Sequence, residues 1–177
     1  MPKIFISFVQ EDNAVAEAVQ QLLREEFRDT LNHGDVFLSS DRWVLRPGEN
    51  WMDRIRQELA ECALVISLLS KRSIDRRWIN FEGGAAWISD KLQPVRFGNL
   101  IMANIPRPYS DLIVVDLRTD PYGLLQAVNE KLTALERAQL RPGQLPPPPR
   151  RGPNYLTLDD ERANQLRWAL DGFVDEP

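Results

Sequence analysis

ALVISLLSKRSIDRRWINFE, residues 63–82, is the stretch of sequence that decides the fold. Its almost continuously apolar start, residues 63–69, is typical of a central parallel strand covered on both faces, although a short run of this kind also fits a buried helix. Ser73 then introduces a helix. The apolar residues of that helix recur at helical spacing and are expected to share one face: Trp78, Phe81, Ala85 and Ile88. The segment therefore predicts a buried strand that leads into a helix.

The same alternation continues on both sides of this segment. Before it, a strand at residues 3–8 leads into a helix over 11–27, and a strand at 36–38 precedes a helix that Asn50 is placed to cap. After it, the pattern predicts strands at 100–105 and 112–117 and a last helix. The core-facing stripe of that helix is Leu125, Val128, Leu132 and Leu135. Alternating strands and helices predict an α/β fold, a doubly wound parallel sheet with helices on both faces.

Composition excludes several classes of protein. Hydrophobic residues make up 43% and charged residues 27% of the 177 residues, as in ordinary soluble globular proteins. The net charge of -4 comes from acidic and basic residues spread along the chain, so no basic stripe is available for nucleic acid. No apolar run approaches the roughly 20 residues that span a bilayer. We therefore expect no direct nucleic-acid partner, no membrane partner and a cytoplasmic location.

Cysteine and histidine are too few for a disulfide or a zinc cluster. Cys62 is the single cysteine, and it opens an apolar run, so it is expected to be a buried free thiol in a reducing compartment. His33 is the single histidine and lies beside Gly34 in a predicted turn. The sequence therefore predicts no metal site.

A change of composition at residue 141 predicts where the domain ends. Six of the thirteen prolines fall between Pro142 and Pro153, which indicates an extended, semi-rigid stretch. We divide the chain into a domain at 1–140, a proline-rich linker at 141–156 and a helical tail at 157–177. The apolar stripe expected in the tail is Leu158, Leu166, Leu170 and Phe173. This stripe either folds back on its own domain or docks to another subunit or a partner protein.

Ligands of open α/β sheets bind outside the carboxyl ends of the strands, so the informative residues follow each predicted strand. Three segments qualify, at residues 7–12, 39–51 and 70–82. The first segment has no glycine and the second has only Gly48, so neither a dinucleotide fingerprint nor a phosphate-binding P-loop is present. A nucleotide that binds here must be held in another way.

Three stretches resemble the TIR (Toll/interleukin-1 receptor) domain family, over a match that runs from Lys3 to Leu135. Lys3-Ile4-Phe5-Ile6-Ser7-Phe8 with Glu11-Asp12 is similar to the family's first box, although many bacterial members have histidine where this chain has Phe8. Leu45-Arg46-Pro47-Gly48-Glu49-Asn50 is similar to the loop after the second strand. Trp78-Ile79-Asn80-Phe81-Glu82 resembles the tryptophan-glutamate motif of bacterial TIR enzymes that cleave NAD. The resemblance implies the flavodoxin-like TIR fold, with about five parallel strands.

What the resemblance implies about function is cleavage of the bond between nicotinamide and ribose in NAD+, with Glu82 as the catalytic carboxylate. Nicotinamide leaves as a neutral molecule, so no general acid is required, and one fixed anion can stabilise the positive charge that develops on the ribose. NAD+ is then the substrate, and no separate cofactor is expected. Gly83 and Gly84 follow Glu82, and two helical glycines suggest a close approach of backbone or ligand.

Five further residues are candidates for substrate binding. Trp78 is expected beside the nicotinamide, although an indole on an apolar helix face is more often a core residue. Phe8 and Trp43 can stack on an aromatic base or simply cover the sheet edge. Arg42 and Arg46 can contact the pyrophosphate, although exposed loop arginines are usually only solvated. Ser70 and Ser73 are expected at a strand end and a helix cap, with no base nearby to activate either.

The alternative function is a non-catalytic interaction module, because many family members act only through homotypic TIR-TIR assembly and a fold alone does not decide function. In the family's enzymes a neighbouring subunit often completes the active site, which implies activity gated by assembly, in bacterial immunity or signalling. A third possibility is a related enzyme such as a deoxyribosyltransferase, which uses a carboxylate in a similar way. The sequence leaves open whether the ADP-ribose product is linear or cyclic.

Overall fold

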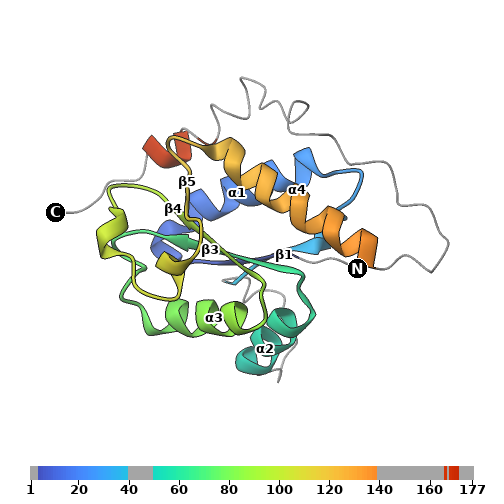
Figure 1. Ribbon diagram of the computed structural model, residues 1–177, viewed down its shortest axis with the longest axis horizontal. Coiled ribbons are helices and arrows are strands. Elements are labelled where there is room, and N and C mark those ends of the chain that lie inside the picture. The colour runs from blue at the N-terminus through green and yellow to red at the C-terminus, as the bar shows by residue number, and fades with distance from the viewer. Residues whose placement is uncertain (1–3, 40–49, 139–165, 167, 172–177) are drawn as a thin grey trace.

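The computed structural model describes residues 4–39, 50–138, 166 and 168–171, which contain one parallel sheet and the helices that cover it (Figure 1). The five strands lie in the order β2-β1-β3-β4-β5, and every neighbouring pair is parallel. The strands are β1 (Ile4–Ser7), β2 (Val36–Leu38), β3 (Leu64–Leu69), β4 (Leu92–Arg96) and β5 (Val115–Asp116). The α-helices are α1 (Asn13–Glu26), α2 (Trp51–Glu61), α3 (Arg77–Ile88) and α4 (Pro121–Ala138).

Helices cover both faces of the sheet. Successive strand residues point to opposite faces, so neighbouring residues of one strand pack against different helices. Ile4 and Ile6 of β1 belong to a hydrophobic cluster with residues of α1 and α4. Phe5, between them, packs in a second cluster that includes Ile55 of α2 and Ala86 of α3. Figure 1 shows α1 and α4 on one side of the strands and α2 and α3 on the other. The predicted doubly wound, flavodoxin-like α/β fold is confirmed.

Most element predictions on the N-terminal side are confirmed. The strands at 36–38 and after Ala63 form as expected, and Asn50 caps α2 by accepting a hydrogen bond from the Met52 amide at 2.9 Å. A 3-10 turn over Gln10–Asp12 precedes α1, so the helix begins two residues later than the sequence suggests.

The predicted strand at residues 100–105 is wrong. The fourth strand is Leu92–Arg96, which the sequence analysis missed because Gln93 and Pro94 interrupt its apolar pattern. Residues 100–105 instead contain a 3-10 turn, Met102–Asn104, and the buried ends of this loop, Leu100 and Ile105, pack beside Tyr109. Throughout residues 97–114, all of them described, 3-10 turns replace an α-helix between β4 and β5.

The shared apolar face expected on α3 is not the face that the fold buries. The helix begins at Arg77 rather than just after Ser73, and Phe81 and Ile88 are 49% and 80% exposed. The buried residues of α3 are Ile79, Glu82, Gly83 and Ala86. Spacing alone does not identify the buried face, because large apolar side chains occur on several sides of this helix, whereas its buried side contains a carboxylate and small residues beside Ile79.

Two residues near the C-terminus pack on the domain that precedes them. Leu166 is buried in the cluster formed by α1, α4 and the sheet, and Leu170 packs against the same cluster. This part of the tail therefore folds back, the first of the two possibilities raised by the sequence. The neighbouring Trp168 is 76% exposed. The stripe residues Leu158 and Phe173 and the expected linker at 141–156 lie outside the described residues.

Cys62, the residue that caps the C-terminus of α2, is a free, buried cysteine, as predicted. Burial raises the pKa of its thiol to about 11. Its Sγ lies 3.2 Å from the carbonyl oxygen of Leu59, which it contacts as donor. Among the helices that the structure describes, none has the length and apolar character needed to cross a bilayer. Within the same described ranges, no group of histidine, cysteine or carboxylate residues is arranged to hold a metal ion.

Candidate active site

The candidate site lies where β1 and β3 run side by side and their chains leave toward opposite faces of the sheet. From β1 the chain enters α1 on one face, and from β3 it enters α3 on the other. Such a topological switch point is where doubly wound sheets bind ligands. Ser7, the last residue of β1, stands directly opposite Ser67 of β3. Both serines are fully buried and lie on the strand positions that face α3.

Glu82 of α3 lies on the face of the sheet to which these two serines point. Its carboxylate accepts a short hydrogen bond from Ser7 Oγ through Oε2. The residue is 0% exposed, and among the residues that the structure describes its Oε1 has no hydrogen-bond partner. Ser67 Oγ likewise has no hydrogen-bond partner within the described ranges. A half-satisfied buried carboxylate is energetically unfavourable in a structural core, so its presence points to a functional role.

Burial also changes the proton affinity of Glu82. Desolvation raises the pKa of its carboxyl group from 4.5 to about 7, and the hydrogen bond from Ser7 lowers it only in part. The charge of the group therefore changes close to neutral pH. Strongly shifted carboxyl groups are concentrated at functional sites, where their charge is used in catalysis or binding.

This pKa predicts how stability depends on pH. Because the folded-state pKa is above the unfolded one, the folded protein binds the Glu82 proton more tightly, and the resulting stability is full below pH 4.5. It is lost as the pH rises to about 7, by an amount of about 3 kcal/mol in the free energy of unfolding. Glu82→Gln lacks this loss, so its stability relative to wild type should increase between pH 4.5 and pH 8.

Urea unfolding of both proteins across this pH range provides the measurement, since subtracting the two curves cancels the titration of all other groups. Two curves that stay parallel from pH 4.5 to pH 8 would show that Glu82 is neither desolvated nor shifted in the folded protein.

Tyr109 forms another wall of this buried polar cluster. Its hydroxyl donates a hydrogen bond to the Ile79 carbonyl oxygen at 2.7 Å, and the ring is fully buried. Burial raises the pKa of Tyr109, and the nearby Glu82 charge raises it further. A Cβ atom on Gly83 would lie 2.0 Å from the Tyr109 hydroxyl oxygen. The close approach that two helical glycines suggested is therefore made by Tyr109 at Gly83, whereas Gly84 faces open space.

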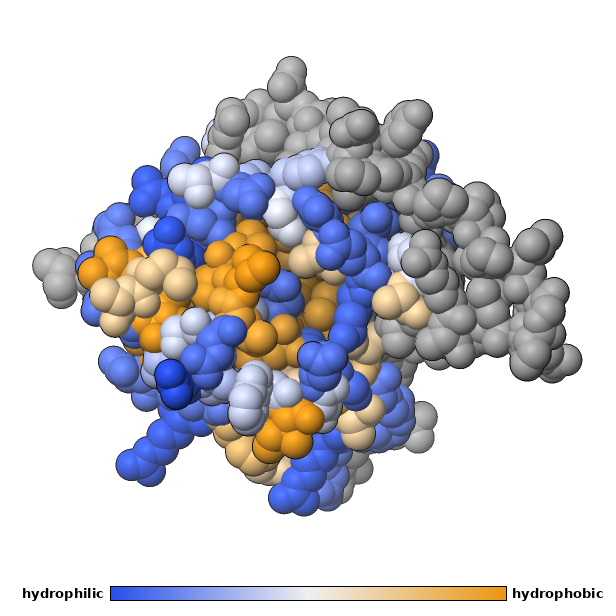
Figure 2. All heavy atoms as spheres, in the orientation of Figure 1, coloured by the Kyte–Doolittle hydropathy of each residue, from blue (hydrophilic) through white to orange (hydrophobic). Residues whose placement is uncertain are grey.

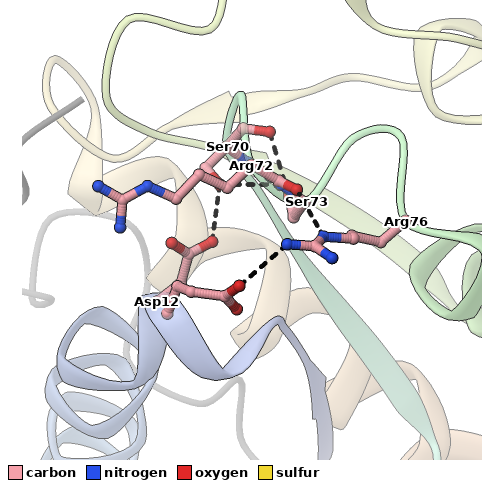
Figure 3. A network of polar contacts seen from close by, with 6 residues as sticks. Asp12, Ser70, Arg72, Ser73 and Arg76 are labelled. Atoms are coloured by element: carbon pink, nitrogen blue, oxygen red, sulfur yellow. Dashed lines mark hydrogen bonds and ion pairs between the residues drawn. The ribbon is translucent and has the colours of Figure 1, made fainter. Parts of the chain in front are cut away.

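A second polar network joins the loops that follow β1 and β3 (Figure 3). Ser70 Oγ donates to Asp12 Oδ2 at 2.7 Å, and both residues are buried. Arg76 Nη2 lies 2.9 Å from Glu11 Oε1 and links the same loops at the surface. The expectation that no base lies near Ser70 is thus wrong, because the fold brings Asp12 to it from 58 residues away. The network fixes the relative position of the two loops beside Glu82.

Ser70 and Ser73 also bond to each other within the loop. The Ser70 amide donates to Ser73 Oγ at 2.7 Å, and the Ser73 amide donates to Ser70 Oγ at 3.2 Å. Ser70 occupies the expected strand end, but the reciprocal bonds close a turn, and Ser73 does not cap α3, whose N-cap is Arg76.

The structure brings together some of the predicted site residues. Trp78 lies one helical turn before Glu82, half-buried, with its ring stacked on Phe81 at 5.4 Å between centroids. Phe8 is 4% exposed and packs in the cluster with α1, on the face of the sheet opposite Glu82. Arg42, Trp43 and Arg46 lie outside the described residues. The substrate contacts expected of these residues stay predictions.

Sequence reasoning missed three members of the site, Ser7, Ser67 and Tyr109. The two serines carried a usable pattern, since each is the polar residue within a buried strand. Tyr109 carried none, because it reaches α3 from an irregular loop 30 residues beyond Ile79.

Comparison with known proteins bears on the identity of the fold. A family model described as TIR domain matches residues 4–133, which include every strand of the sheet and the site around Glu82. A search of the curated proteins found no match. Because the family match covers most of the chain, and the five-stranded parallel sheet agrees with it, this chain belongs to the TIR domain family.

Proposed function

We propose that this TIR domain is an NAD+ nucleosidase, which cleaves the nicotinamide-ribose bond to give nicotinamide and linear or cyclic ADP-ribose. The observation that supports it most is Glu82, a buried carboxylate at the switch point of the sheet with one oxygen unpartnered among the described residues. The family includes both enzymes and adaptors, and this carboxylate favours the enzyme.

The reaction requires little more than a positioned anion. The bond between C1′ of the ribose and the nicotinamide ring nitrogen breaks, and its electron pair stays on the nitrogen, so nicotinamide leaves neutral. The ribose acquires positive charge, which the ionised Glu82 stabilises at close range in a site of low dielectric. Water then adds to C1′ and releases a proton to solvent, or a ring nitrogen of the adenine adds and closes a cyclic product.

The position of Glu82 also supports gating by assembly. The carboxylate is 0% exposed and bonded to Ser7, so NAD+ reaches it only after the surrounding chain has moved. Homotypic contacts between TIR domains, typical of the family, would supply the energy for that movement if they bind the open form better. In this proposal the domain acts in the cytoplasm, in defence or signalling, and a purified monomer is nearly inactive.

The second candidate is an interaction module without catalysis. Large apolar side chains of α3 are exposed, with Phe81 and Trp87 at 49% and Ile88 at 80%. Figure 2 shows apolar patches on one face of an otherwise polar surface, and patches of this kind often mark protein-protein contacts. The same surface would serve assembly in either case, so it does not distinguish the two functions.

The experiment that separates them measures nicotinamide release from NAD+ over a wide range of protein concentration, with and without a crowding agent. Assembly is followed in the same samples by light scattering. An assembly-gated enzyme should release nicotinamide with a rate per protein molecule that rises steeply with concentration. Assemblies that form and yet release no nicotinamide would overturn the enzyme and support the interaction module.

A further inference from the structure

A cavity of about 460 Å³ opens at the carboxyl ends of β4 and β5. Its lining residues come from the ends of these strands and the loops after them: Arg96, Gly98, Asn99, Leu100, Ile101, Asp116, Arg118 and Thr119. None of them belongs to the cluster around Glu82. The volume is within the range of pockets that hold small molecules, and the strand ends are where ligands of parallel sheets bind.

One wall of the cavity is held rigidly by Arg96. Its Nη2 lies 2.7 Å from Asp116 Oδ2, and its Nη1 donates to the Leu100 carbonyl oxygen at 2.7 Å. The ion pair joins β4 to β5, and both side chains are mostly shielded from solvent, at 25% and 18% exposure. A guanidinium fixed by two short bonds presents its charge to the cavity without further loss of side-chain entropy on binding.

Arg118 also lines the cavity and is held less firmly. Its Nη1 donates to Gly98 O at 3.4 Å and to Asn99 Oδ1 at 3.3 Å, both near the upper limit for a hydrogen bond. Its backbone is better anchored, because the Arg118 amide donates to Asp116 Oδ1 at 3.0 Å. An incoming anion with better geometry can therefore replace the two long bonds at small cost.

The remaining wall is mixed in character. Leu100 is buried beneath the cavity and Ile101 is 56% exposed at its edge, so an apolar surface adjoins the charged one. Gly98 has a φ of 64°, which allows the tight turn that brings the loop back toward Arg118. Two arginines against one aspartate leave the lining with an excess positive charge.

We propose that this cavity binds a small phosphorylated molecule of about nucleotide size. The phosphate would lie against Arg118, whose planar guanidinium group matches phosphate oxygens two at a time, with the fixed positive charge of Arg96 nearby. The organic part would pack on Leu100 and Ile101. This site is separate from the one proposed for NAD+ cleavage, and its occupancy does not depend on that activity.

Titration of the full chain with AMP tests the proposal, by calorimetry and by the shifts of backbone amide NMR signals. AMP binding should be saturable and stronger than that of adenosine. The largest changes in amide chemical shift should be those of Gly98, Asn99 and Thr119. Arg118→Ala should weaken AMP binding by about tenfold, because a charge-assisted hydrogen bond is lost. Asp116→Asn should strengthen it by about threefold, because a negative charge near the phosphate is removed.

The matched control is Arg107→Ala, which removes another exposed arginine, one paired with Asp111 outside the cavity. It should leave AMP affinity unchanged. Equal losses in the Arg118 and Arg107 variants, weaker binding in Asp116→Asn, or shifts centred on Ser7 and Glu82 would overturn the proposal. Because binding is read directly, this result is independent of whether nicotinamide is released.

Discussion

Glu82→Gln is expected to reduce nicotinamide release from NAD+ by about 10²- to 10³-fold, the effect of removing one preorganised electrostatic group from an active site. Glutamine keeps the size of the side chain and an oxygen that can accept the Ser7 hydrogen bond, but it has no negative charge for the ribose cation. The loss should appear in kcat more than in KM, since the charge acts on the transition state. The assay is nicotinamide release under conditions in which wild type is assembled.

The matched control is Glu130→Gln, which changes an exposed glutamate of α4 that accepts a hydrogen bond from Gln126, one turn earlier in the helix. It should retain full activity. Wild type should also lose activity as the pH falls below about 7, because Glu82 becomes protonated. A Glu82→Gln protein that assembles normally and still cleaves NAD+ at the wild-type rate would remove Glu82 from the mechanism.

Gly83→Ala should destabilise the protein by about 4 kcal/mol, although alanine is the better helix former by about 1 kcal/mol. A Cβ atom at this position would lie 2.0 Å from the Tyr109 hydroxyl oxygen and 2.4 Å from the ring carbon that bears it. The tyrosine is fully buried, so it can retreat only by giving up its hydrogen bond to Ile79 and its packing in the core. Overpacking and a lost buried hydrogen bond then add.

Gly84→Ala is the control within the same helix, because a Cβ atom there meets nothing within 4 Å. Helix propensity should then act alone and stabilise the protein by about 0.5 to 1 kcal/mol. Urea unfolding of the two variants gives both numbers. If the two substitutions shift the free energy of unfolding equally, the contact between Tyr109 and Gly83 does not limit the packing of α3.

The sequence predicts those parts of the fold in which burial is recorded in local pattern. β3 is covered on both faces and is almost wholly apolar, so it was recognisable, as was the capping position of Asn50. β4 was not recognisable, because Gln93 and Pro94 interrupt its apolar pattern. This segment is a strand because it pairs with β3, and such pairing is not recorded in local sequence. For α3 the apolar pattern did not show which face is buried, since the buried face holds Glu82, Gly83 and Ala86 beside Ile79.

The candidate site was predictable only in its centre. Glu82 was identified through its motif with Trp78, but its partner Ser7 is 75 residues away and Asp12 is 58 residues from Ser70. Contacts across such separations depend on which strands are adjacent, and local spacing contains no information about that. The excess of apolar surface on α3 was visible in the sequence, whereas its exposure was not.

The single buried thiol, at the end of α2, can report the local opening of this domain. With a pKa of about 11, Cys62 is almost entirely un-ionised at neutral pH and is shielded from reagents. An alkylating reagent can therefore reach it only when the cluster that it forms with α2, α3 and the sheet opens, so the labelling rate of the native protein reports how often that opening occurs. Cys62 thus serves as a natural probe of local unfolding in the wild-type chain, and no engineered probe is needed.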